Sequence, residues 1–266
     1  MELFFLFVLG LFIGSFLNVL IDRLPRDESI AKGRSYCDKC KKTLKWYDLI
    51  PVLSFILLRG KCRYCHSPIS YYYPIVEIIT GVFFALTYVY LINYSDLRFT
   101  NYDLQFFVTF LYYLTLISSL IIVFFTDLKY GIIPDKIIFP AAVISIIYHL
   151  SFTIYPNGQL SIINGLLSGF GAFLFFLALY LITRGRGMGF GDVKLVFLLG
   201  IFLGFPKIIS ALYLSFLLGA FVGLILILLK KKRFFKGETI PFGPFLVLGS
   251  IISLFLGENI IRLFIY

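Results

Sequence analysis

The chain has 266 residues, of which 60% are hydrophobic and only 14% are charged. Water-soluble domains are closer to half apolar, so this composition excludes a soluble globule and indicates a membrane protein. The formal net charge is +10, but the basic residues form no separate domain. We therefore interpret the charge as a topology signal and as attraction to anionic headgroups, and expect no nucleic-acid partner.

Apolar runs separated by short polar breaks predict an all-α polytopic membrane protein with about eight transmembrane helices. The first run is expected to remain in the mature protein, because its Met-Glu start lacks the basic region of a signal peptide. The sixth run is short, so either it begins inside the preceding glycine-rich segment or its neighbours shelter it. The runs span 3–21, 71–93, 105–126, 136–153, 160–183, 192–205, 207–229 and 243–265.

The positions of Lys and Arg set the predicted orientation, because basic loops resist translocation. With the N-terminus outside, eight crossings place 21 of the 24 basic residues on the cytoplasmic side and leave Arg98, Lys207 and Arg262 opposite. The predicted cytoplasmic segments are 22–70, 127–135, 184–191 and 230–242. Since the last three are short, their residues can form one shared site.

Three parts follow from this pattern: a first transmembrane helix at 1–21, a cytoplasmic loop domain at 22–70 and a membrane helical domain at 71–266, which holds the candidate catalytic residues described below. The sequence does not set the oligomeric state. The loop domain holds two Cys-x2-Cys pairs, which can present four thiolates to one structural Zn²⁺. A disulfide is a weaker alternative in the reducing cytoplasm. His66 is an alternative ligand, but four thiolates already close a site. The cysteines are Cys37, Cys40, Cys62 and Cys65.

Two carboxylates lie at the same depth on the predicted cytoplasmic side. Asp127 ends the third run, and Asp192 opens the sixth after a segment containing Gly189 and Gly191. Paired carboxylates can share a proton, so that one activates water while the other polarises a scissile carbonyl. Residues without a Cβ would let an extended peptide approach them. We therefore predict an aspartyl protease with Asp127 and Asp192 as its catalytic pair.

Each aspartate also has a structural alternative. Asp192 can be a helix N-cap, and Asp127 can be a solvated helix end beside Lys129. Asp135 is the rival for one catalytic position, although it is favoured as an N-cap of the fourth run.

Two further polar residues, Asn18 and Glu77, lie inside helical runs near the cytoplasmic side. They can line a cofactor pocket, but an interhelical hydrogen bond is the commoner explanation.

Six ordered motifs resemble those of the bacterial type IV prepilin peptidases, which are GxGD aspartyl proteases also described as leader peptidase/N-methyltransferases. The resemblance spans nearly the whole chain. The motifs are GSFLNVLIDRLPR at 14–26, the two cysteine pairs, YYPIVEIITG at 72–81, DLKYGIIPD at 127–135, GFGDVKL at 189–195 and IPFGPFLVLGS at 240–250.

The resemblance implies an enzyme of the cytoplasmic (inner) membrane that removes the basic leader of prepilins or pseudopilins. It also implies methylation of the new N-terminus with S-adenosylmethionine. Asp127 and Asp192 would be catalytic, with Gly189, Gly191 and Lys194 supporting them in the protease loop. Gly60 and Lys61 match positions associated with methyl transfer, and Asn18 and Glu77 are further candidates for the cofactor pocket.

Two other functions compete with the protease interpretation. A transporter or channel could line an ion path with intramembrane carboxylates, but it would leave the cysteine pairs and the glycine run without a role. A non-catalytic scaffold could use the zinc loop to dock an assembly partner.

Overall fold

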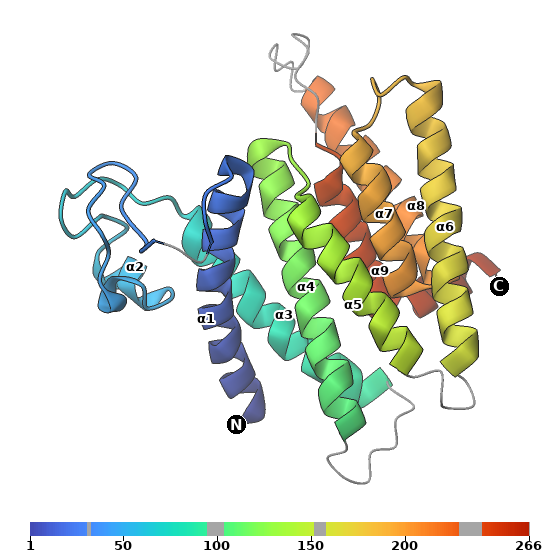
Figure 1. The fold of residues 1–266 in the computed structure, drawn as a ribbon, viewed down its shortest axis with the longest axis horizontal. Helices are drawn as coiled ribbons and strands as arrows, with labels where there is room; N and C mark the ends of the chain where they lie inside the picture. The colour runs from blue at the N-terminus through green and yellow to red at the C-terminus, as the bar shows by residue number, and fades with distance from the viewer. Residues whose placement is uncertain (31–32, 95–103, 152–157, 229–240, 266) are drawn as a thin grey trace. The chain divides into compact units, whose positions relative to one another are not determined.

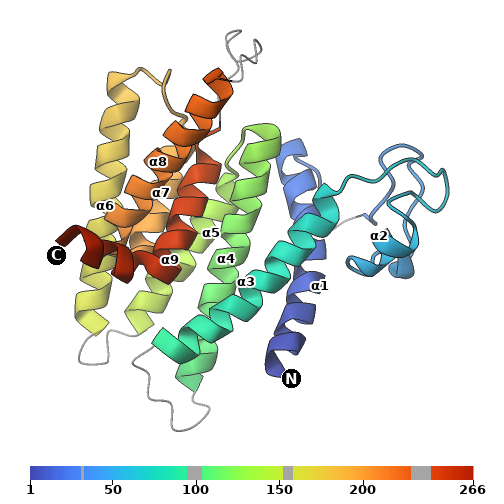
Figure 2. The same cartoon turned by 180° about the vertical axis from the view of Figure 1, so that it is seen from behind.

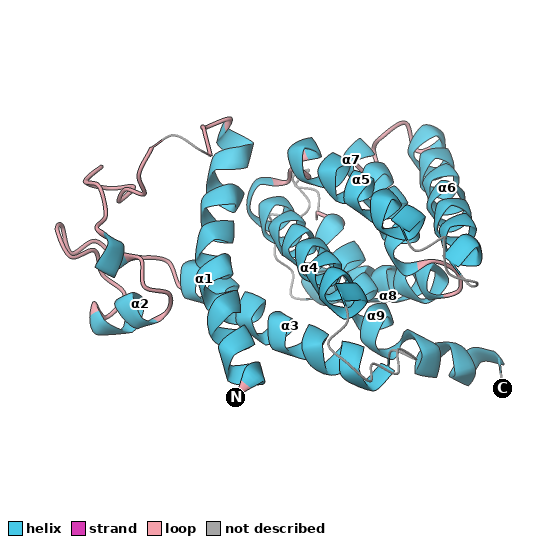
Figure 3. Ribbon diagram, turned by 60° about the horizontal axis from the view of Figure 1, so that its bottom comes forward, coloured by secondary structure: helices cyan, strands magenta, loops and turns pink. Residues whose placement is uncertain are grey.

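The computed structural model describes residues 1–30, 33–94, 104–151, 158–228 and 241–265. Within these ranges the regular structure is helical, apart from two isolated antiparallel bridges that pair Tyr36 with Thr43 and Lys61 with Pro68. Figure 3 shows helices and loops throughout the described residues. The predicted all-α class is therefore confirmed.

Each of the eight predicted apolar runs contains one long helix. These helices are α1 (Glu2–Arg23), α3 (Tyr72–Tyr94), α4 (Leu104–Tyr130), α5 (Asp135–Ser151), α6 (Gly158–Ile182), α7 (Phe190–Leu203), α8 (Lys207–Leu228) and α9 (Gly243–Ile265). The polar insertion adds three short elements, η1 (Leu24–Arg26), η2 (Trp46–Asp48) and α2 (Leu53–Leu57).

Five helices of the described residues are long and apolar enough to cross a membrane, and Gly243–Gly257 is a shorter apolar helix. The five are Glu2–Arg26, Tyr72–Asn93, Leu104–Tyr130, Ile162–Ile182 and Lys207–Leu228. The count of eight crossings, and the orientation that depends on it, therefore remain predictions. The cytoplasmic segment predicted at 230–242 lies largely outside the described residues.

The chain divides into two compact units, Met1–Ile122 and Val123–Tyr266. The division falls inside α4, and the three predicted parts with boundaries at 21 and 70 stay a prediction. In the first unit, α1 and α3 pack tightly and run antiparallel, with Asn18 donating to the carbonyl of Tyr73. A Cβ on Gly10 would lie 2.6 Å from the Cα of Gly81. Glycine therefore allows the two backbones to touch, as is common between membrane helices.

In the second unit, α7 packs against α5, α6, α8 and α9. Its fourteen residues span about 21 Å, and most of them are buried, including Leu195, Leu199 and Ile201. The helix begins at Phe190, inside the glycine-rich segment. Both explanations offered for the short sixth run therefore hold, because the helix starts early and is sheltered by its neighbours.

The pairs α6–α7 and α8–α9 are antiparallel. Gly169 lies against Gly200 in the first pair, and Ser210 bonds Ser253 at 2.6 Å in the second. Figure 2 shows α8 and α9 side by side. Because these helices alternate in direction, α7 and α9 begin at the same end of the unit. That end carries the candidate protease residues.

Candidate functional site

Asp127 lies in the last turn of α4 and Asp192 is the third residue of α7. Both side chains belong to the second unit, and each residue is only 5% exposed. Gly191, which precedes Asp192, and Gly243, whose amide bonds Asp127, both lie against the side chain of Ile133, so the two carboxylates belong to one region of the unit. Buried carboxylates are costly without partners. The burial of Asp127 therefore argues against the alternative of a solvated helix end, and the catalytic role of the two residues stays a prediction.

Each carboxylate accepts a hydrogen bond from a glycine amide. The Gly243 N–H donates to Asp127 Oδ2 at 3.0 Å, and the Gly189 N–H donates to Asp192 Oδ2 at 3.1 Å. Asp192 therefore does serve the helix start, as its structural alternative predicted, although it lies inside the helix and Gly189 is the N-cap residue. Its second oxygen, Oδ1, is buried and has no hydrogen-bond partner among the described residues. This oxygen is available to a water or a substrate.

Ile133 connects the glycine segments around the two acids. A Cβ on Gly191 would lie 3.1 Å from Ile133 Cβ, and one on Gly243 would lie 3.2 Å from Ile133 Cδ1 and 2.5 Å from Asp127 Oδ2. Gly243 has no room for a side chain, and a side chain on Gly191 would be tight against Ile133. Gly189 differs, because its nearest contact would be Asp192 Oδ2 at 3.5 Å. Gly191 and Gly243 thus serve internal packing, while Gly189 leaves open space beside the carboxylate.

Lys194 lies one turn beyond Gly191 on α7 and pairs with Asp135, the first residue of α5. Its Nζ lies 2.7 Å and 2.8 Å from the two carboxylate oxygens. The same Nζ lies over the rings of Phe139 and Phe190. Asp135 begins a helix as expected, but its carboxylate binds Lys194. Its position as a rival catalytic acid is correspondingly weakened.

The four cysteines form a second site, in the first unit. Their sulfurs all lie within 4.8 Å of one another, and Cys37 Sγ is 3.9 Å from Cys65 Sγ. In a tetrahedral zinc site with Zn–S bonds of about 2.3 Å, two sulfurs lie nearly as far apart as those of Cys37 and Cys65 do here. The cluster therefore fits a metal ion held by four thiolates.

The two cysteine pairs sit in matching turns. Cys37 N–H donates to Lys42 O and Cys62 N–H donates to Ser67 O, at 3.0 Å and 2.9 Å. Lys41 and His66 occupy the same place in the two turns, and both have a positive φ near 55°. His66 is therefore the counterpart of an exposed lysine and lies outside the cluster of four sulfurs. Its alternative as a metal ligand loses support.

Hydrogen bonds in these turns favour the thiolate forms of Cys37 and Cys65, whereas at Cys40 the Lys42 amide, which lowers the pKa, is outweighed by burial and the neighbouring cysteines, which raise the pKa to about 11. The hydroxyl and amide of Ser67 lower the pKa of the Cys65 thiol. Burial raises the pKa of Cys37, but the amides of Cys40 and Lys39 outweigh it and bring the value to about 6. At neutral pH these two sulfurs are therefore prepared for metal coordination.

Asn18 and Glu77 lie buried where α1 packs on α3. Glu77 Oε2 accepts a 2.7 Å bond from the amide of Val52, and Ser15 also donates to the same carboxylate. Asn18 donates to Tyr73 O, which is the interhelical bond expected, but its Oδ1 is buried without a partner among the described residues. One strong acceptor thus remains unused in this interface.

Gly60 and Lys61 belong to the second cysteine turn. The carbonyl of Gly60 accepts from Ile69 N–H at 2.7 Å, and Lys61 pairs with Pro68. Gly60 has a φ of +67°, a conformation that residues with a Cβ rarely adopt. The ring of Phe55 lies against Gly60 and stacks edge-on against Tyr71, just before α3. The position of Gly60 and Lys61 therefore depends on the folded cysteine turn.

Three contributors to these sites were not singled out from the sequence: Ile133, Gly243 and the amide of Val52. Ile133 and Gly243 lie inside motifs that carried the resemblance, at 127–135 and 240–250, so the motifs held a signal. The sequence held no such signal for Val52, because the group that bonds Glu77 is its backbone amide, which every residue except proline has.

Two family models match the chain, one mainly over the unit that holds the cysteines and the other mainly over the unit that holds the aspartates. The model described as Bacterial Peptidase A24 N-terminal domain matches residues 8–91, and that of the Type IV leader peptidase family matches residues 114–224. The chain is 35% identical over 265 residues to the prepilin leader peptidase/N-methyltransferase of Bacillus subtilis, covering 98% of this chain and 96% of the relative. The chain belongs to the type IV prepilin leader peptidase family.

Two other family members extend the comparison. The protein of the same name from Myxococcus xanthus is 36% identical over 84% of this chain and 63% of the relative, and that from Aeromonas hydrophila is 32% identical over 96% and 91%. No solved structure matches this one. Family membership and the apolar helices identify a multi-pass membrane protein, and they give no support to the transporter alternative.

Proposed function

We propose that this protein is a membrane aspartyl endopeptidase that removes the basic leader from a prepilin or pseudopilin and then methylates the new N-terminus. The observation that carries the proposal is the pair of buried carboxylates, Asp127 and Asp192, each held by one glycine amide at the shared end of α4 and α7. The names of the relatives, prepilin leader peptidase/N-methyltransferase, supply the substrate class.

Two carboxyl groups that act on each other ionise one at a time and so share a proton. The ionised member takes a proton from a water molecule, while the protonated member donates a hydrogen bond to the scissile carbonyl. The amides of Gly243 and Gly189 stabilise negative charge on Asp127 and Asp192 during this exchange. Asp192 Oδ1, buried without a partner among the described residues, offers an acceptor for the water.

Gly189 supports approach of the substrate backbone, because the nearest contact of a Cβ added there would be Asp192 Oδ2 at 3.5 Å, so the position is not filled by the protein itself. Lys194 supports the same loop through its ion pair with Asp135, which joins the second turn of α7 to the first residue of α5. These contacts give the loop residues positioning roles rather than roles in bond cleavage.

The four thiolates of Cys37, Cys40, Cys62 and Cys65 are proposed to hold Zn²⁺ with a structural role, since four protein ligands leave no position open for a substrate. The methyl donor S-adenosylmethionine supplies a methyl group from a sulfonium cation. Buried Glu77 provides negative charge, and Asn18 Oδ1 provides an unused acceptor. With Gly60 and Lys61, they are the proposed residues of the methyl-transfer site.

We also propose the orientation in which the N-terminus is outside and both sites are on the cytoplasmic side of the inner membrane. The charge asymmetry supports it. The shared end of α4, α5, α7 and α9 is consistent with it, because it carries the predicted cytoplasmic segments 127–135 and 184–191.

The test combines purified protein in lipid, a synthetic prepilin and labelled S-adenosylmethionine, with products read by mass spectrometry. Wild-type protein should release the leader and transfer the label. Asp127→Asn and Asp192→Asn should each reduce cleavage by about 10²–10⁴-fold while the protein remains folded. A substrate that already lacks its leader should still be methylated by both variants. Full cleavage by the double variant would disprove the assignment.

A further inference from the structure

The polar insertion carries an apolar surface that faces away from its own core. Leu53, Ile56 and Leu57 of α2 are 50%, 63% and 72% exposed. Their spacing of three and four residues puts them on one face of the turn. Trp46, in the neighbouring η2, is 77% exposed. Clustered large apolar side chains on a polar domain usually mark a contact surface.

Two contacts fix this surface beside α3. The amide of Val52, the residue before α2, donates to buried Glu77, and the ring of Phe55 lies 5.3 Å from that of Tyr71. Val52 holds a φ of +56°, which is strained for a β-branched residue. That conformation directs its amide to Glu77, so the position of α2 is determined by the membrane helix.

The depth of α2 follows from the same contact. Glu77 lies five residues beyond Tyr72, which is about 8 Å along α3. On α1 it lies against Gly14, about 14 Å before the final residue Arg23. Figures 1 and 2 show α2 alongside α1 rather than beyond its end. The start of α2 therefore lies about 8–14 Å inside the ends of the two helices, so its exposed apolar side chains are on the acyl-chain side of the headgroups.

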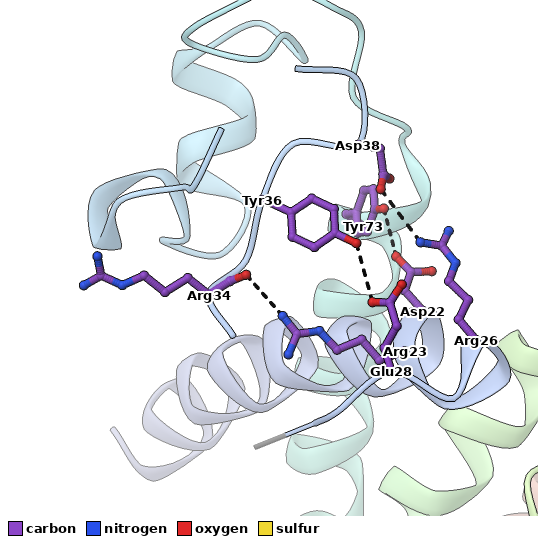
Figure 4. Close-up of polar contacts among 8 residues, drawn as sticks. All are labelled: Asp22, Arg23, Arg26, Glu28, Arg34, Tyr36, Asp38 and Tyr73. Carbon is purple, nitrogen blue, oxygen red and sulfur yellow. Dashed lines mark hydrogen bonds and ion pairs between the residues drawn. The ribbon is translucent and has the colours of Figure 1, made fainter. Parts of the chain in front are cut away.

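The start of the insertion is also tied to α1. Arg23 donates to the carbonyl of Arg34 at 3.2 Å, Tyr36 to Glu28 at 3.5 Å and Tyr73 to Asp22 at 2.9 Å, as Figure 4 shows. The first cysteine turn is therefore held at the carboxyl end of α1. The insertion is tied to the membrane helices on both sides, which limits movement of α2 away from the bilayer.

The charge around the apolar face identifies its partner. Residues 39–63 contain seven Lys or Arg residues and one carboxylate, Asp48, which is paired with Arg63 at 2.7 Å. Such a surface attracts anionic lipid headgroups and repels a basic peptide. The exposed cations are Lys39, Lys41, Lys42, Lys45, Arg59, Lys61 and Arg63.

We propose that residues 46–57 form an interfacial anchor, in which the apolar face of α2 inserts into the leaflet at the carboxyl end of α1 and the surrounding cations bind anionic phospholipid headgroups. An apolar turn beside basic residues is the pattern of segments that lie in a membrane interface. The anchor goes beyond leader cleavage and methyl transfer. It gives the insertion a lipid contact of its own.

The test uses the full chain in vesicles and one fluorescent reporter. Trp46 is the only tryptophan of the chain, so Ile56→Trp in a Trp46→Phe background reports from α2 alone. In phosphatidylcholine vesicles containing phosphatidylglycerol, its emission should shift to the blue, resist acrylamide and be quenched by lipids brominated near the headgroup. Without phosphatidylglycerol, or at high salt, quenching by bromine should fall.

Adding Leu53→Ser and Leu57→Ser to the reporter protein should abolish the bromine quenching. Phe221→Ser, the same kind of change on the exposed face of α8, should leave it unchanged. Equal zinc content and thermal unfolding would show that each variant is folded. The proposal is overturned if the reporter is fully accessible to acrylamide in anionic vesicles. It is equally overturned if shielding appears only with added substrate peptide or with rising protein density in the membrane.

Discussion

The amide of Gly243, the first residue of α9, donates a hydrogen bond to the buried carboxylate of Asp127 in α4. This bond joins segments 116 residues apart and leaves no space for a side chain between them. The helix start thereby becomes part of the proposed protease site.

Gly243→Ala should reduce leader cleavage. The new methyl would lie 2.5 Å from Asp127 Oδ2, so the carboxylate must shift, and a misplacement of about 1 Å can cost around 100-fold in rate. The overpacking should also destabilise the protein by about 1–3 kcal/mol. Gly223→Ala is the matched control, because nothing lies within 4 Å of its Cβ. Normal cleavage kinetics in Gly243→Ala would show that the contact has no part in catalysis.

Gly189→Ala should behave differently, because the protein itself has room for the methyl and the φ of −77° suits alanine. We expect unchanged thermal stability but a loss in kcat/KM of about 10-fold or more, since the methyl would enter the path of the substrate backbone. Steady-state kinetics with a prepilin peptide would measure this. If stability falls with activity, the residue serves packing and not substrate approach.

The ion pair of Lys194 with Asp135 should matter more for rate than for stability. The pair is partly exposed, so its loss should cost about 1 kcal/mol or less. Lys194→Met should nevertheless lower kcat, because the turn that carries Asp192 loses its link to α5. Asp135→Asn should lower kcat by a similar factor. The double variant should have a kcat no lower than that of either single variant, because both changes remove the same ion pair.

Two further variants separate the geometry of this pair from its charge. Lys194→Arg should restore part of the rate, and Lys136→Met, which removes a charge beside the pair, should leave kcat near the wild-type value. Strictly additive losses in the two single variants would contradict a shared role.

Asp48 should stabilise the insertion in a pH-dependent manner. Burial raises the pKa of this carboxyl, but hydrogen bonds from Arg63, Lys45 and Tyr64 outweigh it, and the net pKa lies below the usual range. A lowered folded-state pKa contributes stability above the unfolded value of about 3.9. That contribution is lost as the pH falls through the lower folded value.

Hydrogen exchange across residues 45–64 measures this effect, with rates corrected for intrinsic exchange. Asp48→Asn should exchange faster than wild type at pH 7, and the difference should disappear at acid pH, where the wild-type carboxyl is also neutral. Asp38→Asn is the control, because Asp38 is exposed and 3.8 Å from Arg26. A difference that persists at acid pH would point to a cause other than charge.

Zinc removal should affect the two reactions unequally. Elemental analysis should find about one zinc per chain, and Cys37→Ser or Cys62→Ser should lose it. Methyl transfer should fall, because Gly60 and Lys61 are placed by the second cysteine turn. Cleavage should fall less, since Asp127 and Asp192 belong to the other compact unit. If zinc removal abolished cleavage and left methyl transfer intact, the cysteine turns would serve the protease site and not the methyl-transfer site.

Much of this arrangement was predictable, because apolar runs favour helices in a membrane protein and each of the eight runs contains a helix, five of them long and apolar enough to cross a membrane. The paired cysteines also predicted a cluster, since both turns are local. The spatial relation of Asp127 to Asp192 was not predictable, because it depends on how α4, α7 and α9 pack. The Asp135–Lys194 pair was missed for the same reason. A helix cap was expected at Asp135, but a cation 59 residues away takes the carboxylate.

The matching cysteine turns have a consequence for the order of synthesis. All four sulfurs precede Tyr72, the first residue of α3, so the complete ligand set leaves the ribosome before the second long helix does. Metal capture can therefore precede insertion of α3, and Glu77 then meets a turn that is already folded. Among the long helices of the described residues, α1 alone precedes the cysteine turns, so this part of the protein can fold before the other membrane helices are made.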